Sequence, residues 1–495
     1  MAIAAAETAS RTPVVSPTPA TFAGTPAGAA VLSLLFAVLY AVYALLYRGS
    51  AHQDAANHYG YARDGLRSLS ILLDPWGRPL WSAALAIPAQ FGLSAARVFC
   101  AFLAGLALYQ TWRLARLVIP QSALLAIPAL GFQIHFFALA GDTMTEPLFA
   151  LVFAVAYRMW LEDRRVLSLL TASLLPLARP EGFFLGILWG FFVLASPLPL
   201  RKRLTLPLLL LAGTFLWFLG GLAADRDPLF IVHHWPPNWT PLDIYGSGRL
   251  LHYVTEWPMF TGAAMLVPFL AGFAVLALGR RPIHFVTFAF FFTLHTLLWW
   301  RGLFGSIGYL RYFVCIAPLI ALFTAEGLRF TAVLLAAFRI PVAATAGVLI
   351  LGSAAQTAWM YEAQGQLQVF AAYEDSLGVW KDEGLLEPPP SIVADAFARH
   401  VTRDRDVWRY QPPAVDPAEQ LKAYRAMPKG TRILWDDQMG GGYYHLGPAQ
   451  FGSVGYRIRS RRVYDLDRFR APWYQALRGP RPEWIEITLY EKVAP

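Results

Sequence analysis

Long apolar runs recur along almost the whole chain, and they restrict its fold more than any other feature. A helix of about 20 apolar residues is long enough to cross the hydrocarbon core of a bilayer. The pattern therefore predicts a mostly α-helical, polytopic transmembrane bundle of about 11 spans. These runs fall at 28–47, 94–112, 121–140, 146–161, 166–178, 182–197, 204–223, 259–279, 283–300, 309–327 and 340–357.

The composition supports a membrane protein. Of the 495 residues, 56% are hydrophobic and 15% are charged, whereas about a quarter of an average soluble domain is charged. The formal net charge of +9 is explained by basic loops between spans, so no nucleic-acid partner is expected. The two cysteines, Cys100 and Cys315, lie inside apolar runs. They are expected to be buried small hydrophobic residues rather than a disulfide or a metal site.

The basic residues predict an orientation. If the N-terminus is cytoplasmic, every short basic cluster falls on the cytoplasmic side, as the positive-inside rule requires. The protein is then expected in the cell inner membrane, with the C-terminal domain outside the cytoplasm. The basic residues that carry this argument are Arg113, Arg116, Arg158, Arg164, Arg165, Arg201, Lys202, Arg203, Arg280, Arg281, Arg329 and Arg339.

Three parts are expected along the chain: a disordered tail at 1–27, a transmembrane domain at 28–357 and a small soluble α/β domain at 358–495. In the last part the charge rises and the long apolar runs stop. Strands are expected at 391–394, 431–435 and 484–490, with a helix near Pro417–Ala426. The glycine run at 440–442 is interpreted as a plain turn, with a phosphate cradle as the alternative.

The first external loop contains a candidate general base, Asp54. Helical spacing places Asn57, His58 and Tyr61 on the same face as Asp54. A partly desolvated carboxylate can act as a general base, although an Asp here can also simply cap an interfacial helix. A metal site of His52, Asp54 and His58 would have no standard ligand spacing.

A second candidate is the turn before the run at 146–161. Thr143 and Glu146 fit a capping box that opens this helix. Capping alone does not explain Asp142, and the same helix N-terminus offers free N–H groups to an anion on the external face.

Three arginines and a histidine also lie at the external ends of apolar runs. Arg179 stands between two spans, where it needs a carboxylate or phosphate partner. Arg311 either snorkels to lipid headgroups or clamps a lipid-linked phosphate. Arg301 follows two tryptophans, and His295 is either a satisfied polar residue inside the bundle or a ligand of the substrate. The loop at 224–258 adds tryptophans suited to the interface or to sugar stacking, and a weak glycosylation sequon at 238–240.

Taken together, the motifs resemble the GT-C glycosyltransferases, closest to the protein mannosyltransferase and aminoarabinose transferase branch. The resemblance rests on "QDAANHYGYARDGL", "GDTMTEPLF", "LARPEGFF" and "RYFVCIAPLIAL", and the pattern covers most of 28–357. One departure is Ala55, which follows Asp54 where the mannosyltransferases usually have a Glu. Asp54 is therefore the sole carboxylate at this point.

The resemblance implies a membrane glycosyltransferase that takes a sugar from a polyprenyl-phosphate-linked donor to a lipid, glycan or protein acceptor. Asp54 would be the catalytic base of an inverting transfer, and Asp142 would orient the acceptor or a divalent metal, Mg or Mn. Two alternatives stay open, namely a transporter or flippase of lipid-linked intermediates and a non-catalytic partner subunit. The candidate substrate- and phosphate-binding residues are Arg179, Arg311, Arg301, Glu146, His58 and His295.

Overall fold

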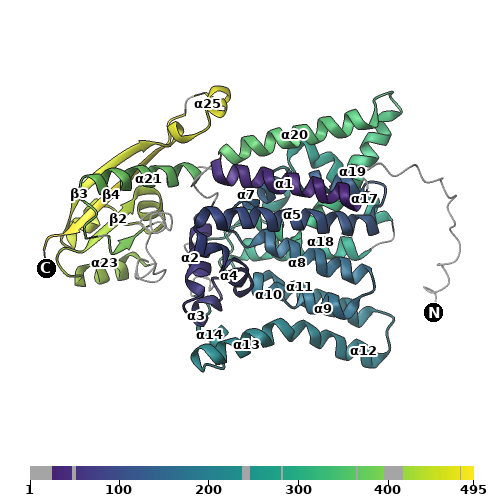
Figure 1. Ribbon diagram of the computed structural model, residues 1–495, viewed down its shortest axis with the longest axis horizontal. Coiled ribbons are helices and arrows are strands. Elements are labelled where there is room, and N and C mark those ends of the chain that lie inside the picture. Colours follow the sequence, from purple (N-terminus) through teal and green to yellow (C-terminus); the bar gives the residue numbers. More distant parts are fainter. Residues whose placement is uncertain are drawn as a thin grey trace.

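The computed structural model describes residues 25–46, 52–236, 246–279, 282–363, 366–388, 390–394, 416–479 and 481–494. Almost all of the tail expected at 1–27, the sequon at 238–240 and two of the basic residues used for orientation, Arg280 and Arg281, lie outside this part. The described residues form a helical bundle that is followed by a small sheet domain (Figure 1).

Six helices or helix runs in the described residues are long and apolar enough to cross a membrane. The pair α6 (Ala126–Gly131) and α7 (Ile134–Ala140), preceded by η3 (Ala123–Leu125), is bent by 71° and would make a seventh span. The six are α1 (Pro26–Leu46), α5 (Leu93–Val118), Leu200–Asp225 (α12 Leu200–Thr205, η4 Leu206–Leu211, α13 Ala212–Asp225), α18 (Pro282–Arg301), Leu310–Ala336 (η7 Leu310–Ile316, α19 Ala317–Ala336) and Val342–Asp382 (α20 Val342–Ala363, α21 Gln366–Asp382).

The other apolar runs form shorter helices. Every predicted apolar run coincides with helix. The shorter helices, however, have too few residues to cross a membrane as single straight helices, so the predicted number of eleven spans is not confirmed. The shorter helices are α8 (Glu146–Leu161), α9 (Arg165–Ala172), α10 (Leu175–Ala178), α11 (Glu181–Ala195), α16 (Pro258–Thr261) and α17 (Ala263–Leu278). Neighbouring helices shield α8, in which most side chains are buried, whereas α9, α11 and α17 expose apolar side chains such as Leu167, Phe191 and Leu278.

Small elements gather at one end of the bundle (Figure 1). The short apolar segment at 79–93 is mostly helical, and it leads directly into α5. The small elements are α2 (Gln53–Gly65), α3 (Leu69–Leu72), α4 (Pro79–Leu85), η2 (Pro88–Phe91), α14 (Phe230–His233) and α15 (His252–Thr255).

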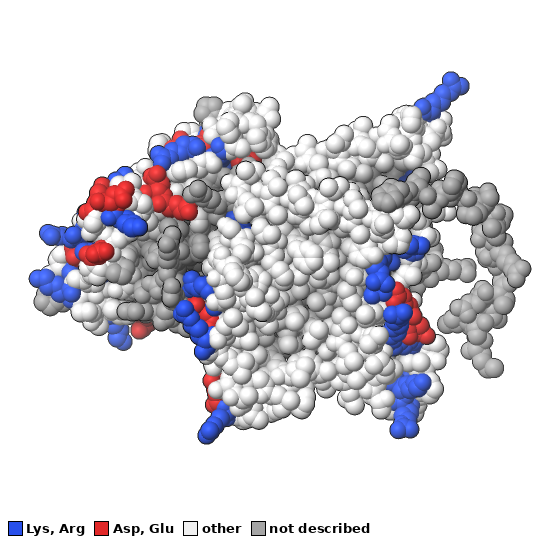
Figure 2. Space-filling view, in the orientation of Figure 1, with Lys and Arg blue, Asp and Glu red and all other residues white. Residues whose placement is uncertain are grey.

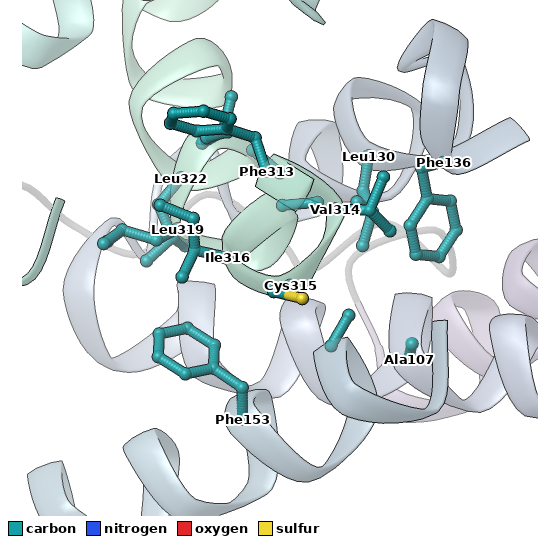
Figure 3. Close-up of a cluster of buried hydrophobic side chains, with 14 of the residues drawn as sticks. Ala107, Leu130, Phe136, Phe153, Phe313, Val314, Cys315, Ile316, Leu319 and Leu322 are labelled. Atoms are coloured by element: carbon teal, nitrogen blue, oxygen red, sulfur yellow. The ribbon is translucent and has the colours of Figure 1, made fainter. Parts of the chain in front are cut away.

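The start of the Leu310–Ala336 run lies at the centre of the core. Figure 3 shows Phe313, Val314, Cys315 and Ile316 among side chains from other helices, and all four are buried. Both cysteines are free and buried, as expected from their apolar surroundings.

Within its described residues, the C-terminal domain forms a four-stranded sheet of order β1-β2-β4-β3. Strand β1 is parallel to β2, and the other pairs are antiparallel. The helix α21 covers one face, and α23 (Pro417–Ala426) and α24 (Pro448–Ser453) contribute to the other. The strands are β1 (Ile392–Val393), β2 (Arg432–Asp436), β3 (Tyr456–Asp465) and β4 (Trp484–Lys492).

Three of these strands match the expected ones, and β3 was missed. Four of its ten residues are arginines, at 457, 459, 461 and 462, so β3 has few of the apolar side chains that mark a strand in a sequence. Charged side chains are accommodated because β3 is an edge strand with much of its surface exposed. The glycine run lies in a π-helical turn, η8 (Asp437–Tyr443). A Cβ on Gly440 would lie 2.2 Å from Nε1 of Trp435, so this glycine permits the turn to pack over the indole.

The sheet domain sits at the end of the bundle where α2, α3 and α4 lie, and α1 begins at the opposite end (Figure 1). Figure 2 shows charged residues over the sheet domain and at both ends of the bundle, with an almost uncharged band between them. Such a band is what a multi-pass membrane protein presents to lipid.

Candidate active site

The first turn of α2 places Asp54 at the end of the bundle. His52 is the N-cap in an extended conformation, and its Nδ1 accepts a hydrogen bond from the backbone N–H of Asp54 at 3.2 Å. The Asp54 carboxylate is turned inward, where Nη2 of Arg311 donates to its Oδ2 at 2.6 Å. The N-cap of α2 is therefore His52 and not Asp54, and the Asp54 side chain is held by its ion pair with Arg311.

Arg311 comes from the first turn of η7 and points into the protein. Its side chain is only 10% exposed, and its guanidinium lies over the ring of Tyr309 at 4.6 Å. Its Nε is also 3.6 Å from Oε1 of Glu146. Arg311 therefore binds carboxylates inside the bundle and does not snorkel toward lipid headgroups.

Glu146 connects Arg311 to Arg179. This fully buried carboxylate lies 2.7 Å from Nη1 of Arg179. Arg179 also donates to both oxygens of Glu181, with Nη2 at 2.9 Å from Oε1, and to the hydroxyl of Thr145 at 2.9 Å. Glu146 at the start of α8 and Glu181 at the start of α11 therefore both face the guanidinium of Arg179.

The expected capping box at the start of α8 is wrong. Thr145, not Thr143, is the N-cap, and it makes no side-chain cap hydrogen bond. The Thr143 hydroxyl donates instead to the carbonyl of Ala55 at 2.7 Å, which fixes this turn against α2. Two buried arginines near Glu146 attract its carboxylate more strongly than a backbone N–H does.

A third arginine, Arg78, belongs to the same group and was missed from the sequence. It has a positive φ of 64°, and its Nη1 donates to the carbonyl of Pro75 at 2.7 Å. Burial lowers the pKa of Arg78 to about 10, with Arg179 acting in the same direction and Glu181, Glu146 and Asp54 opposing it. The sequence did contain a signal for Arg78. Like Arg179, it is a charged residue beside a proline in a mostly apolar segment, and it therefore needs a carboxylate or phosphate partner.

We call these six residues the ion-pair cluster: Asp54, Arg78, Glu146, Arg179, Glu181 and Arg311. The cluster has three guanidinium groups and three carboxylates, so its formal charges balance. The nearby histidines do not alter the balance, because both are neutral at neutral pH. Burial and the Arg311 charge lower the pKa of His52 to about 3. Burial and the Arg78 charge hold the pKa of His58 well below its usual value, and its ring stacks on Trp76 at 4.7 Å.

The surroundings of Asp54 keep it ionised. Burial acts to raise the pKa of this carboxyl, but the neighbouring His52, the Arg311 charge and the hydrogen bond from Arg311 outweigh burial. The pKa of Asp54 therefore lies below its ordinary value. A carboxylate held in this way is a weak base for as long as Arg311 remains its partner.

Besides His58, three predicted site residues lie outside the ion-pair cluster. Asp142 is buried and accepts a hydrogen bond from the N–H of Thr143 at 2.8 Å. Arg301 is exposed and lies over the ring of Trp300. His295 is buried and stacks on Tyr312 at 5.0 Å, and that ring also lies 5.6 Å from the guanidinium carbon of Arg179.

The donor set does not fit a divalent metal. Within the described residues, no group of three or more His, Cys, Asp or Glu side chains converges as a metal site would require. Asp54 is occupied by Arg311, and Asp142 by the backbone of its own turn.

The C-terminal domain rests on the helix that carries Asp54. Ala56 of α2 packs against the apolar cluster formed by α21 and the sheet, which includes Val369, Phe370 and Tyr373. The ion-pair cluster therefore lies close to the junction of the two domains.

No family model matches the chain, and no curated protein matches it. Among solved structures, the chain is similar to a crystal structure of ArnT from Cupriavidus metallidurans bound to undecaprenyl phosphate. The TM-score is 0.58 at 13% sequence identity, over 94% of this chain and 98% of that chain. The likeness supports the polytopic, GT-C-like fold that the sequence motifs suggested.

Proposed function

We propose that the protein is a membrane glycosyltransferase that moves a sugar from a polyprenyl-phosphate donor to an acceptor hydroxyl on the extracytoplasmic face. The observation that carries this proposal is the Asp54–Arg311 pair, at 2.6 Å. It places a candidate base for a hydroxyl nucleophile beside a candidate binding group for a phosphate leaving group.

The reaction follows from these two groups. The Asp54 carboxylate takes the proton of the acceptor hydroxyl as the hydroxyl oxygen attacks the anomeric carbon. The bond between that carbon and the phosphate oxygen breaks, and the electron pair leaves with the lipid phosphate. Arg311 and Arg179 neutralise the charge on the departing phosphate. Attack opposite the leaving group inverts the configuration at the anomeric carbon.

The ion-pair cluster also suggests how a weak base becomes a strong one. A donor phosphate binds Arg311 only by competing with the carboxylates that hold it. Once Arg311 turns to the phosphate, Asp54 loses the partner that lowers its pKa. In a buried site the pKa of Asp54 then rises, and the carboxylate becomes a better proton acceptor when the donor is bound.

Polar atoms around the cluster support a ligand here. Nε of Arg311, Oδ1 of Asn57 and Nδ1 of His58 are buried and have no hydrogen-bond partner among the described residues. Buried polar atoms are normally paired, and a phosphate with its attached sugar offers both acceptors and donors. The undecaprenyl phosphate named for the similar ArnT structure is the class of carrier that this site would take.

The test uses the full-length protein in nanodiscs, an undecaprenyl-phosphate sugar and a panel of acceptors. We expect Asp54→Asn to reduce transfer by about a hundredfold or more, as loss of a general base does, while undecaprenyl phosphate still binds. Asp225→Asn is the matched control, because this partly exposed carboxylate accepts from Ser70 outside the ion-pair cluster.

Three outcomes distinguish the alternatives. Unchanged transfer by Asp54→Asn removes this residue from the mechanism. Movement of the lipid carrier across the bilayer of closed proteoliposomes, without sugar transfer, identifies a flippase. Binding of the carrier without transfer or movement identifies a non-catalytic subunit. The inner-membrane location and the extracytoplasmic C-terminal domain belong to the same proposal.

A further inference from the structure

The short helix α25 (Pro472–Arg478) in the C-terminal domain turns apolar side chains outward and polar side chains toward the protein. Trp473 and Leu477 point outward, with exposures of 42% and 73%, and Ala476 between them is exposed as well. The polar residues point inward. Gln475 donates to the carbonyls of Asp467 and Arg470.

Arg478 completes the inward face. Its Nη1 donates to Oδ1 of Asp467 at 2.8 Å, and its guanidinium lies over the ring of Tyr474. A helix on a water-exposed surface turns its polar residues to solvent and its apolar residues to the core. The reversal in α25 is typical of a surface that meets an apolar medium.

The helix is tied to the end of a lipid-exposed span. Tyr474 packs on Trp359 of α20, with ring centroids 4.6 Å apart. Arg470 donates to the backbone carbonyl of Glu362, and the N–H of Ala471 donates to the Glu362 carboxylate at 3.1 Å. These contacts hold α25 beside the last turn of α20.

The rest of α20 shows what surrounds this position. Val348 and Leu351 are each 69% exposed, so the flank of this helix faces lipid. In Figure 1, α25 stands outside the bundle beside the end of α20 where the C-terminal domain begins. Its outward apolar face therefore continues the lipid-facing surface of the bundle at the level where that surface ends.

We propose that α25 is a membrane anchor of the C-terminal domain, with Trp473 and Leu477 inserted at the boundary between headgroups and acyl chains. Trp and Leu are suited to this depth, because the indole has an apolar ring and a polar N–H. The anchor gives the domain a second attachment to the bilayer, apart from the covalent connection through α20.

The experiment places a fluorophore at this face. Leu477→Cys is labelled with a thiol-reactive, environment-sensitive dye in nanodiscs of phosphatidylethanolamine and phosphatidylglycerol. Cys100 and Cys315 are buried, and the wild-type chain serves as the labelling blank. Lys422→Cys is the matched control, since this exposed side chain lies on α23, farther from the bundle. Trp473→Cys gives an independent measurement on the same face as Leu477.

We expect nitroxide-labelled lipids to quench the dye at 477 and 473 several-fold more strongly than at 422, and aqueous iodide to show the opposite order. Equal quenching by iodide at 477 and 422 overturns the proposal. Shielding from both quenchers also overturns it, because it shows that a protein surface covers α25. Neither readout depends on sugar transfer, so the anchor and the proposed function can fail separately.

Discussion

A carboxylate and a guanidinium held 2.6 Å apart, as Asp54 and Arg311 are, influence each other's protonation. Replacing Arg311 by Gln removes the charge that lowers the pKa of Asp54, so that pKa rises. In the proposed mechanism the ionised carboxylate is the active form, so the acidic limb of the activity profile should move to higher pH. We expect residual transfer by Arg311→Gln to be lost on acidification at a pH where the wild type remains active.

The measurement is kcat/KM for transfer across the acidic to neutral range. Arg301→Gln is the control, since this exposed arginine lies outside the ion-pair cluster and should leave the acidic limb in place. An identical limb in Arg311→Gln and wild type would show that Asp54 is not the titrating base.

Glu146 offers a second test at the residue scale, because it is fully buried between two arginines. Removing one partner of a buried ion pair costs about 3–5 kcal/mol, so Glu146→Gln should lower the thermal stability. A lipid phosphate would replace the missing charge. We therefore expect undecaprenyl phosphate to raise the melting temperature of Glu146→Gln more than that of the wild type, and an equal rise would contradict phosphate binding at this cluster.

Among the helices, α17 and α19 cross at two glycines. A Cβ on Gly327 would lie 1.6 Å from the carbonyl oxygen of Pro268, and one on Gly272 would lie 1.8 Å from that of Phe323. No alanine fits at such a crossing unless the helices separate. The contact thus depends on the absence of side chains, as is common between membrane helices.

Gly327→Ala should therefore destabilise the protein by about 1–3 kcal/mol, the usual cost of overpacking. The matched control is Gly347→Ala in α20, where a Cβ would meet nothing within 4 Å and where Ala favours the helix by about 0.5–1 kcal/mol. Thermal unfolding in detergent compares the two, and similar melting temperatures would show that the α17–α19 crossing can relax.

Element positions could be predicted from the sequence because apolar runs dictate where membrane helices form. The number of spans could not, since the break at 132–133 and the short helices depend on packing between neighbours. Asp54, Arg179 and Arg311 could be singled out as charges at the external ends of apolar runs. Their pairing could not be, because Asp54 and Arg311 are 257 positions apart. In the sequence, Asp142 and Arg301 were equally good candidates for this site. In the structure, Asp142 accepts a hydrogen bond from the N–H of Thr143 and Arg301 lies over the ring of Trp300, so neither belongs to the ion-pair cluster.

At the scale of the whole molecule, the orientation can be tested directly. The proposed topology places the C-terminus outside the cytoplasm, because the basic loops between spans would lie inside. Alkaline phosphatase fused after Pro495 should be active in cells, whereas a green fluorescent protein fusion at the same point should be dark. The reverse pattern would overturn the topology and the extracytoplasmic site together.

The balanced charges of the ion-pair cluster have a consequence for how the donor arrives. Enzymes that attract charged substrates from solution project a net field, and their association rates fall steeply as ionic strength rises. Three guanidinium groups matched by three neighbouring carboxylates project almost no such field beyond a Debye length of about 8 Å at physiological salt. A lipid-linked donor of the proposed kind would therefore be captured with little help from long-range attraction, by lateral diffusion within the bilayer, and we expect its capture to be nearly insensitive to salt.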